Sequence, residues 1–425
     1  MKELFYIEGI TSCEESNKGG FGHLIVDRIT GDAVDALSNP EKKFEFESLR
    51  TKIPLREGDI PVVKNLEGRF LITSKNSKPS LEALANGKPG GNTTLARKIK
   101  AFIIATNADL EKKSRNLNES YLSPNRKKWF YCPINVGNGD CTVIISPDLE
   151  TFVFDFGYEN QSALKKLYKL WDFIDRSEKV KIERKISGFG ISHPDIDHYS
   201  GCGFFLKHAN FSRKNNQPCI IFCNYKMSYG GTAWAKTKSK IAVLAKNPNF
   251  CVVKMPLLNS PVPSVHFTAG LIAHYLWPYE DRNLIFRTSK GGISTNNSSI
   301  ALLIEDNFGI RANLFGDIES FAWQRVNRRI NALNLYLKPR KHIFKFSHHG
   351  AASGNMYFKS NSIPGTVNEQ WGKRALYTFT SYDPNSMRSF TPCRIADSFS
   401  PYNSTSAVNG YVCEFDGAKT KVNTF

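Results

Sequence analysis

The 425-residue chain lacks several features that would place it among membrane or secreted proteins. No apolar run approaches the roughly 20 residues of a membrane helix, and the N-terminal stretch is not apolar enough for a secretory signal. The nine cysteines are odd in number, scattered, and mostly within apolar runs, which is typical of reduced core residues and not of a disulfide framework. These absences predict a soluble cytoplasmic protein without a membrane partner.

Motifs of several common enzyme classes are also absent. The sequence contains no Gly-x-Ser-x-Gly elbow, no Cys-x-x-Cys redox pair and no dinucleotide fingerprint after a strand. The stretch Asn86–Thr94 has the composition of a phosphate loop but lacks the Gly-Lys-Ser/Thr order, so we interpret it as a flexible loop. Cys219 and Cys223 share one apolar run with no second pair nearby, which predicts a buried strand instead of a metal-binding pair.

Acidic residues are scarce relative to basic ones. The chain has 57 Lys and Arg against 39 Asp and Glu, which gives a formal net charge of +18 and a pI near 9.4. This excess favours a polyanionic partner, while a solvated basic surface is the open alternative. A hydrophobic content of 41% and an aromatic content of 12% predict a globular protein with a substantial core.

The residue pattern predicts two parts. Residues 1–125 contain short β-like runs at 4–10, 23–26 and 70–73, and residues 96–105 form either a strand or a basic helix. We expect a small, mainly-β appendage there, which a protein partner could contact, joined through a polar linker at about 110–128. Residues 126–425 alternate strands and helices, as in α/β or α+β proteins. Strands are expected at 130–134, 142–145, 151–154, 186–191, 220–223, 251–255, 265–277, 299–305, 311–315, 342–346, 375–380 and 411–415; helices are expected around 164–174, 202–206, 233–244 and 320–333.

A cluster of metal-binding residue types follows the apolar run 186–191. His193, Asp195, Asp197 and His198 place four such side chains within six positions. Asp317 follows a glycine at another strand end, and His348 and His349 follow a third strand. Imidazole nitrogens and carboxylate oxygens on three loops are enough ligands for two divalent ions with positions left for water. The alternative is a polar turn that caps the next helix.

The stretch Ser192–His198 resembles the H-x-H-x-D-H signature of the metallo-β-lactamase fold, with Asp195 in place of the second histidine. Three further segments resemble the branch of that superfamily found in the hydrolase domain of ComEC, a DNA-uptake protein. They are Asn135–Asp140 with Asp155–Gly157, then Phe315–Glu319, then Phe346–Gly350. The resemblance extends from about Trp129 to Ser381 and implies a four-layer αββα sandwich. A bacterial defence or DNA-processing role follows from family association only.

The resemblance also implies a ligand arrangement. His193, Asp195 and Asp317 would bind one ion, and Asp197, His198 and one adjacent histidine would bind the other. We expect His348 to be that ligand and His349 either to face the substrate or to donate a hydrogen bond to a ligand, although the sequence leaves the order of the two open. Asp197 would orient the water or receive its proton. Because Asp195 supplies an anionic oxygen, manganese is an alternative to zinc. No further downstream histidine ligand is apparent, since His266 and His274 lie in apolar runs and are expected to be buried.

Basic residues surround these motifs and point to a phosphorylated substrate. The segment between the second and third metal-bearing loops contains Arg325, Arg328 and Arg329, and Asn297, Ser353 and Asn355 would donate hydrogen bonds to phosphate unless they are turn residues. The aromatic rings of Tyr225, Tyr229 and Trp234 offer faces for base stacking. The sequence therefore predicts a dinuclear-metal nuclease acting on DNA or RNA. The alternatives are a phosphodiesterase of a cyclic or oligonucleotide signal and a binding module with an impaired metal site; the oligomeric state is open.

Overall fold

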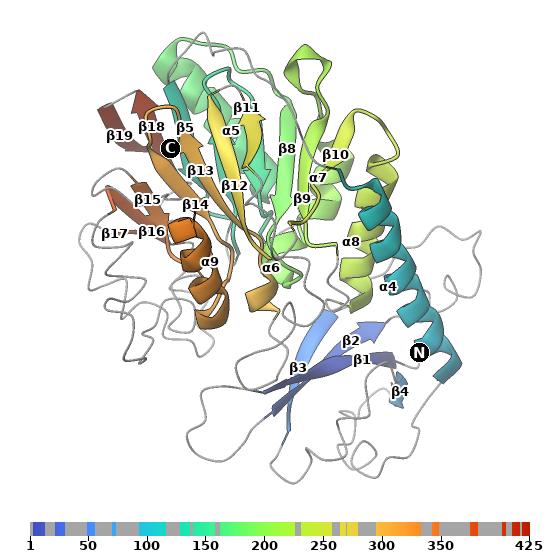
Figure 1. Ribbon diagram of the computed structural model, residues 1–425. Helices are drawn as coiled ribbons and strands as arrows, with labels where there is room; N and C mark the ends of the chain where they lie inside the picture. The colour runs from blue at the N-terminus through green and yellow to red at the C-terminus, as the bar shows by residue number, and fades with distance from the viewer. Residues whose placement is uncertain are drawn as a thin grey trace, which may run out of the picture. The chain divides into compact units, whose positions relative to one another are not determined.

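The structure is a computed structural model in which two compact units can be described, each by itself (Figure 1). The first unit contains β1–β4, α4 and α8, and the second contains the other elements. None of the helices described is long and apolar enough to cross a lipid bilayer. The residues described are 3–12, 22–29, 49–55, 70–73, 93–115, 128–136, 139–157, 162–225, 231–256, 264–268, 270–278, 295–332, 342–347, 375–380, 402–404, 410–416 and 419–425.

The first unit is built on a four-stranded antiparallel sheet in the order β3-β2-β1-β4. Its strands are β1 (Glu3–Ser12), β2 (Gly22–Ile29), β3 (Leu49–Leu55) and β4 (Phe70–Thr73). Three of them were predicted. The strand β3 was not predicted, because Pro54 argues against a strand. It lies at the edge of the sheet, where proline is tolerated.

Two helices complete the first unit, α4 (Thr93–Lys113) and α8 (Gly231–Leu244). The open choice between a strand and a helix at 96–105 is resolved as helix. Ile99, Ile103, Thr106 and Leu110 are buried and recur at the three- and four-residue spacing of one helical face. The helix also covers the start of the predicted linker, most of which lies outside the described residues.

The second unit contains an eight-stranded mixed sheet in the order β10-β9-β8-β7-β6-β5-β18-β19. Its strands are β5 (Lys128–Pro133), β6 (Thr142–Ile145), β7 (Thr151–Phe154), β8 (Ile186–Ile191), β9 (Cys219–Cys223), β10 (Phe250–Val252), β18 (Tyr411–Asp416) and β19 (Lys419–Thr424). The expected strands are confirmed, and both cysteines of β9 are buried. The edge strand β19 was not predicted, because it is polar and Lys419 and Lys421 are exposed along it.

A second, seven-stranded sheet has the order β11-β12-β13-β14-β15-β16-β17. Its strands are β11 (Ser264–Thr268), β12 (Leu271–Trp277), β13 (Ala301–Asp306), β14 (Arg311–Leu314), β15 (His342–Lys345), β16 (Tyr377–Thr380) and β17 (Tyr402–Ser404). The prediction of one strand over 265–277 was wrong. The chain turns back near Gly270, whose φ of 82° suits glycine, and forms an antiparallel hairpin.

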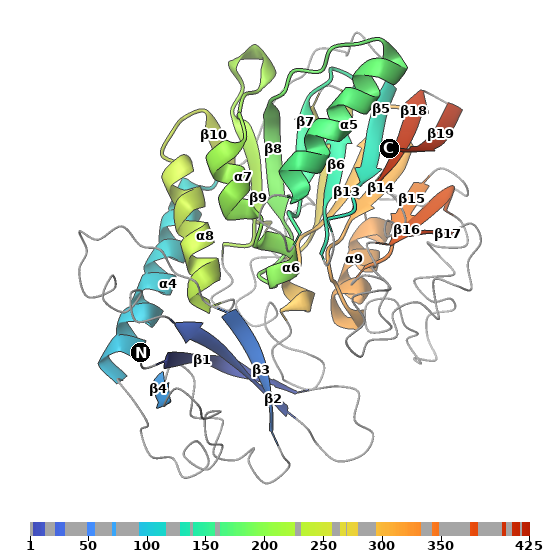
Figure 2. The same cartoon turned by 180° about the vertical axis from the view of Figure 1, so that it is seen from behind.

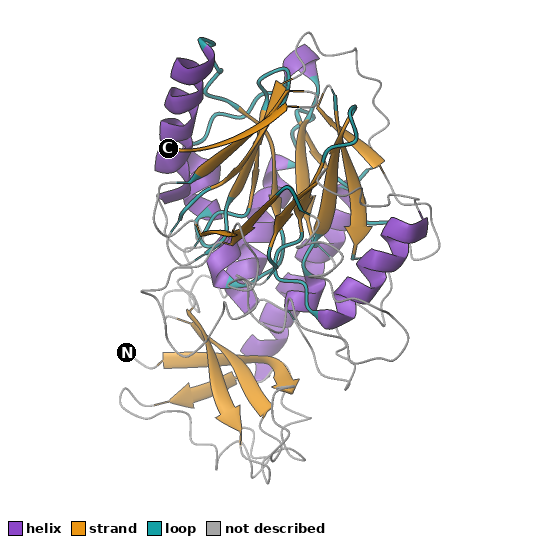
Figure 3. Cartoon of the chain, turned by 90° about the vertical axis from the view of Figure 1, so that its left-hand side faces the viewer, coloured by secondary structure: helices purple, strands orange, loops and turns teal. Residues whose placement is uncertain are grey.

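Helices cover the outer faces of both sheets, and Figure 3 shows the sheets side by side between them. On the first sheet, α5 (Ser162–Glu178) and α7 (Cys202–His208) lie on the face turned to the viewer in Figure 2. On the second sheet, α9 (Ser320–Ala332) buries Trp323, Val326 and Ile330. The unit therefore has the four-layer αββα arrangement that was predicted.

The inner faces of the two sheets are joined by aromatic packing and by specific polar contacts. Trp129 donates its indole N–H to Asp306 over 2.8 Å, and the Tyr131 hydroxyl donates to the carbonyl oxygen of Asn313 over 2.9 Å. Lys345 and Asp140 form a buried ion pair between the same sheets. Because each of these groups is buried, it needs its partner across the interface, and the pairs fix how the sheets sit on each other.

Candidate metal centre

Two buried histidines occupy the end of β8. His193 lies on the loop after the strand, and His198 lies on the short helix α6 (Ile196–Tyr199). The backbone holds this loop in place, because the Asp195 carbonyl accepts the His198 N–H over 3.0 Å and the His198 carbonyl accepts the Phe156 N–H over 2.8 Å. The two imidazole rings are adjacent, with their centroids 4.2 Å apart and their planes tilted by 54°.

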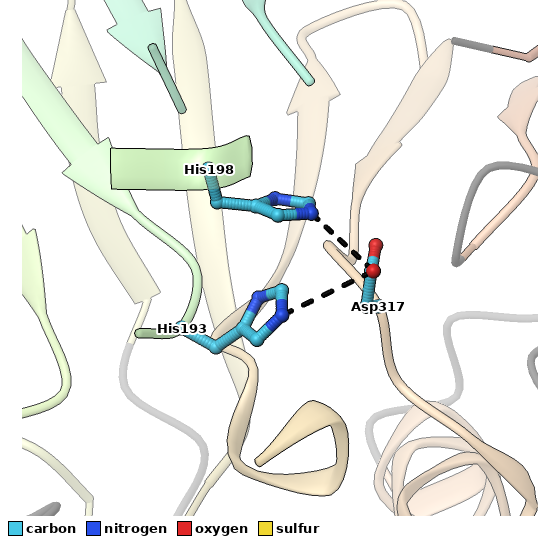
Figure 4. A group of neighbouring side chains, drawn as sticks. All are labelled: His193, His198 and Asp317. Atoms are coloured by element: carbon cyan, nitrogen blue, oxygen red, sulfur yellow. Dashed lines mark ion pairs between the residues drawn. The ribbon is translucent and has the colours of Figure 1, made fainter. Parts of the chain in front are cut away.

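Asp317 approaches both histidines from the second sheet (Figure 4). Its Oδ2 lies 3.3 Å from Nε2 of His198 and 3.9 Å from Nε2 of His193. This approach depends on Gly316, whose φ is 54° and whose added Cβ would stand 2.5 Å from the Cβ of Ser192. Glycine is thus required for both its backbone conformation and the close contact between the two loops.

The two other predicted ligands of the first loop lie beside the histidines. Oδ2 of Asp195 is 3.5 Å from Nε2 of His193, and Oδ2 of Asp197 is 3.9 Å from Nε2 of His198. The side chains of Asp195 and Asp197 are 23% and 31% exposed, whereas both histidines are fully buried. The imidazoles therefore lie at the buried side of the cluster, and the two carboxylates lie where solvent or a substrate can reach them.

Asp155 orients His198 through Nδ1, the ring nitrogen that does not face Asp317. Its Oδ2 lies 2.9 Å from Nδ1 of His198, and its Oδ1 accepts the backbone N–H of Ser192 over 2.7 Å. A carboxylate at Nδ1 directs the other ring nitrogen, Nε2, toward Asp317 and raises its basicity. Asp155 holds the left-handed φ of 60°, which costs a non-glycine residue free energy and is frequent at functional sites. This role of Asp155 was not predicted from the sequence, although an Asp before Phe-Gly at a strand end was the available signal.

The electrostatics of the cluster favour a cation. Burial by itself lowers the pKa of His198, but the carboxylates of Asp317, Asp197 and Asp155 raise that pKa well above its ordinary value. Nε2 of His193 is buried and has no hydrogen-bond partner among the described residues. Ligand atoms of His193, His198 and Asp317 all lie within 4.8 Å of one another. A buried imidazole nitrogen of this kind is what a divalent ion binds, so the residues present fit a metal ion.

The third predicted loop is described only up to its start. The Ser347 hydroxyl contacts the carbonyl oxygens of Gly316 and Ile318, both at 2.8 Å. The chain therefore passes the Asp317 turn just before the double histidine. His348, His349, Ser353 and Asn355 lie outside the described residues, so their roles stay predictions, as does the division of the ligands between two ions.

The residues predicted to bind substrate have varied surroundings. Oδ1 of Asn297 accepts the backbone N–H groups of Glu319 and Ala322 over 3.1 and 3.2 Å, which stabilises the start of α9. On α9, Arg328 is exposed and Arg329 is buried, while Arg325 lies over the Trp277 ring at 5.9 Å. Their contact with substrate stays a prediction. Tyr225 and Trp234 are buried, so the expectation that they stack on bases was wrong, and Tyr229 lies outside the described residues.

The two other histidines considered as ligands lie elsewhere. His274 on β12 is buried, with Nδ1 2.8 Å from the Ser264 hydroxyl and Nε2 3.1 Å from Glu305, which also pairs with Arg311 at 2.8 Å. His266 is exposed on β11, contrary to the expectation that it is buried. Among the described residues, neither histidine joins a potential metal-binding group.

Comparison with known proteins gives little beyond this geometry. No family model matches the chain, and no curated protein matches it. Among solved structures, the chain is similar to a metallo-β-lactamase from Hirschia baltica at 9% sequence identity and a TM-score of 0.26. The match covers 52% of this chain and 87% of the lactamase. Because the sequence identity and the TM-score are both low, the fold is assigned from the two sheets and their covering helices, and the chemistry is inferred from the residues of the site.

Proposed function

We propose that this protein is a metal-dependent hydrolase that cleaves phosphodiester bonds in nucleic acid. The observation that carries the proposal is the approach of Asp317, from the second sheet, to the buried nitrogens of His193 and His198. Residues 119 or more positions apart thus supply imidazole and carboxylate to one small space. Two divalent ions, zinc or manganese, are the occupants we propose, held by His193, Asp195, Asp197, His198, Asp317 and His348.

The chain's own residues have distinct tasks in this proposal. Bound divalent ions lower the pKa of a coordinated water and so supply a hydroxide at neutral pH. Asp197, which is partly exposed, orients the attacking water and accepts its proton. Asp155 holds the His198 ring in one tautomer. The buried imidazoles and Asp317 form a fixed set of ligands, relative to which the reacting groups are positioned.

The charge of the chain supports a nucleic-acid substrate. A net charge of +18 attracts the phosphate backbone, and α9 carries three arginines and no acidic residue. Arg328 is exposed, so its guanidinium is available to phosphate oxygens. These features favour a polymer over a small phosphodiester, and they do not distinguish DNA from RNA.

The test is a cleavage assay with labelled single- and double-stranded DNA and RNA and a cyclic dinucleotide, each with manganese, zinc or magnesium. The control is the doubly substituted Asp197→Ala/His198→Ala protein, purified in the same way. We expect metal-dependent cleavage of at least one polymer by the natural chain and none by the control. Equal degradation by both proteins would identify a contaminant, and cleavage of the cyclic dinucleotide alone would replace the polymer with a small signal as substrate.

A further inference from the structure

A pocket of about 210 Å³ opens at the amino end of β8, opposite the end that bears the metal centre. Ser187 lines it near the start of the strand, and His193 follows the strand's other end. At about 3.3 Å per residue, the six residue steps from Ser187 to His193 correspond to roughly 20 Å, so the pocket is separate from the metal centre. The lining residues are Leu149, Glu150, Glu183, Lys185, Ser187, Ser212, Arg213 and Lys214.

The walls of this pocket are fixed by hydrogen bonds. The turn before β7 is closed by the Ser146 hydroxyl, which accepts the Glu150 N–H over 3.0 Å. The segment opposite is tied to β8, because the Ser212 N–H donates to the Ile186 carbonyl over 3.1 Å. Glu150 joins the two walls by accepting the Lys214 N–H over 2.8 Å. A site whose walls are already ordered loses little conformational entropy on binding.

The lining has an excess of positive charge. Its three cations are Lys185, Arg213 and Lys214, and its two carboxylates each have a donor within the pocket: Glu150 the Lys214 N–H, and Glu183 the Lys185 ammonium at 2.9 Å. The Lys185–Glu183 pair is 43% and 63% exposed, so its stability is slight and Lys185 can turn toward a ligand. Arg213 is buried, and its guanidinium is fixed by a hydrogen bond to the Pro218 carbonyl over 3.1 Å; a guanidinium has further N–H groups that can bind a ligand. The Lys214 ammonium donates to the Asp148 carbonyl at the exposed side of the pocket, and a phosphate would compete with that neutral acceptor.

We propose that this pocket binds the phosphate monoester group of a mononucleotide. The lining supplies two ammonium groups, a guanidinium and two serine hydroxyls, and this number of donors suits the three terminal oxygens of a monoester better than the two of a carboxylate. Since a water fills about 30 Å³, the volume corresponds to roughly seven waters, which leaves space for the phosphate and part of its sugar. The nucleobase of the bound mononucleotide would extend into solvent. This proposal does not depend on hydrolysis at the metal centre.

The test is calorimetric titration of the full chain, freed of metal by a chelator, with adenosine 5′-monophosphate, inorganic phosphate and adenosine. We expect saturable binding of the monophosphate, weaker binding of phosphate and no binding of adenosine. Lys185→Ala and Lys214→Ala should each weaken the affinity for the monophosphate at least about fivefold, since each removes one charge-assisted contact. The control Lys246→Ala, which removes an exposed lysine elsewhere in the same unit, should leave the affinity within about twofold of the natural chain.

Three outcomes would overturn the proposal. Equal affinities for the pocket and control variants would mean attraction by net charge alone, and the absence of saturable binding would mean that the pocket takes no nucleotide. Loss of binding in Asp317→Asn would place the nucleotide at the metal centre instead. Because the titration uses metal-free protein and no turnover, a failure of the proposed hydrolase activity would leave these results unchanged.

Discussion

Asp317→Asn should abolish most of the stabilisation that a divalent ion gives to the second unit. The substitution keeps the size of the side chain but removes the charge that faces both histidines at 3.3 and 3.9 Å. An ion that binds only the folded state, and whose free concentration is a hundred times its Kd, stabilises that state by about 2.7 kcal/mol. For a unit of roughly 280 residues with an unfolding entropy of about 2.1 cal/mol/K per residue, this corresponds to a rise in Tm of about 5 °C.

The assay is thermal unfolding of the natural chain and the variant, each with chelator and with zinc or manganese. The variant should show a metal-dependent rise of less than about 1 °C, because a neutral amide is a weaker ligand than a carboxylate. Asp416→Asn is the matched control, since it makes the same change at an exposed residue of the same unit and should keep the full response. If Asp317→Asn and the natural chain respond equally, Asp317 is not a ligand and the proposed centre is wrong.

Three further predictions concern the supports of the centre and of the second sheet. Asp155→Asn should weaken metal binding about 10- to 100-fold in competition with a chromophoric chelator, because the amide orients the His198 ring less well; an unchanged affinity would contradict its positioning role. Gly316→Ala should cost more unfolding free energy in urea than Gly309→Ala, because both residues have positive φ but only at Gly316 would the new Cβ meet another loop; equal losses would argue against that close contact. Glu305→Gln tests a pKa shift. Burial raises the pKa of Glu305, but hydrogen bonds from the neighbouring histidine and arginine outweigh it and hold the pKa below its ordinary 4.5. The carboxylate therefore stabilises the fold above that pH and loses this contribution as the pH falls through the lowered pKa. The loss of unfolding free energy in Glu305→Gln, measured in urea, should thus become smaller in acid. A loss that is constant with pH would refute the assignment.

The parts of the fold that could be predicted are those with a strong local signal. Strand β8 is a continuous apolar run ending in a dense group of ligands, and α5 and α9 repeat apolar residues at helical spacing. His193, His198 and Asp317 were chosen for residue type and position after strands, and the structure brings them together.

The features that were missed depend on contacts between distant residues. No local pattern shows that Asp155 pairs with His198, 43 positions later, or that Gly316 must pass close to Ser192. The hairpin at Gly270 interrupts an apolar run that resembles one long strand, and burial of Trp234 depends on tertiary packing, which its sequence neighbours do not reveal. Exposed edge strands such as β19 need no apolar face, so the periodicity that identifies other strands is absent.

The polarity of β19 has a consequence for how copies of this chain meet. Among the strands that the structure describes, β19 is the outermost of its sheet and pairs with β18 on one side only. A strand edge without a partner is a template for pairing with another molecule. Lys419 and Lys421 would bring like charges together if two such edges aligned. Such repulsion would oppose pairing of two β19 edges, and concentrated salt, which shortens the reach of charge to about 3 Å at 1 M, should weaken that opposition.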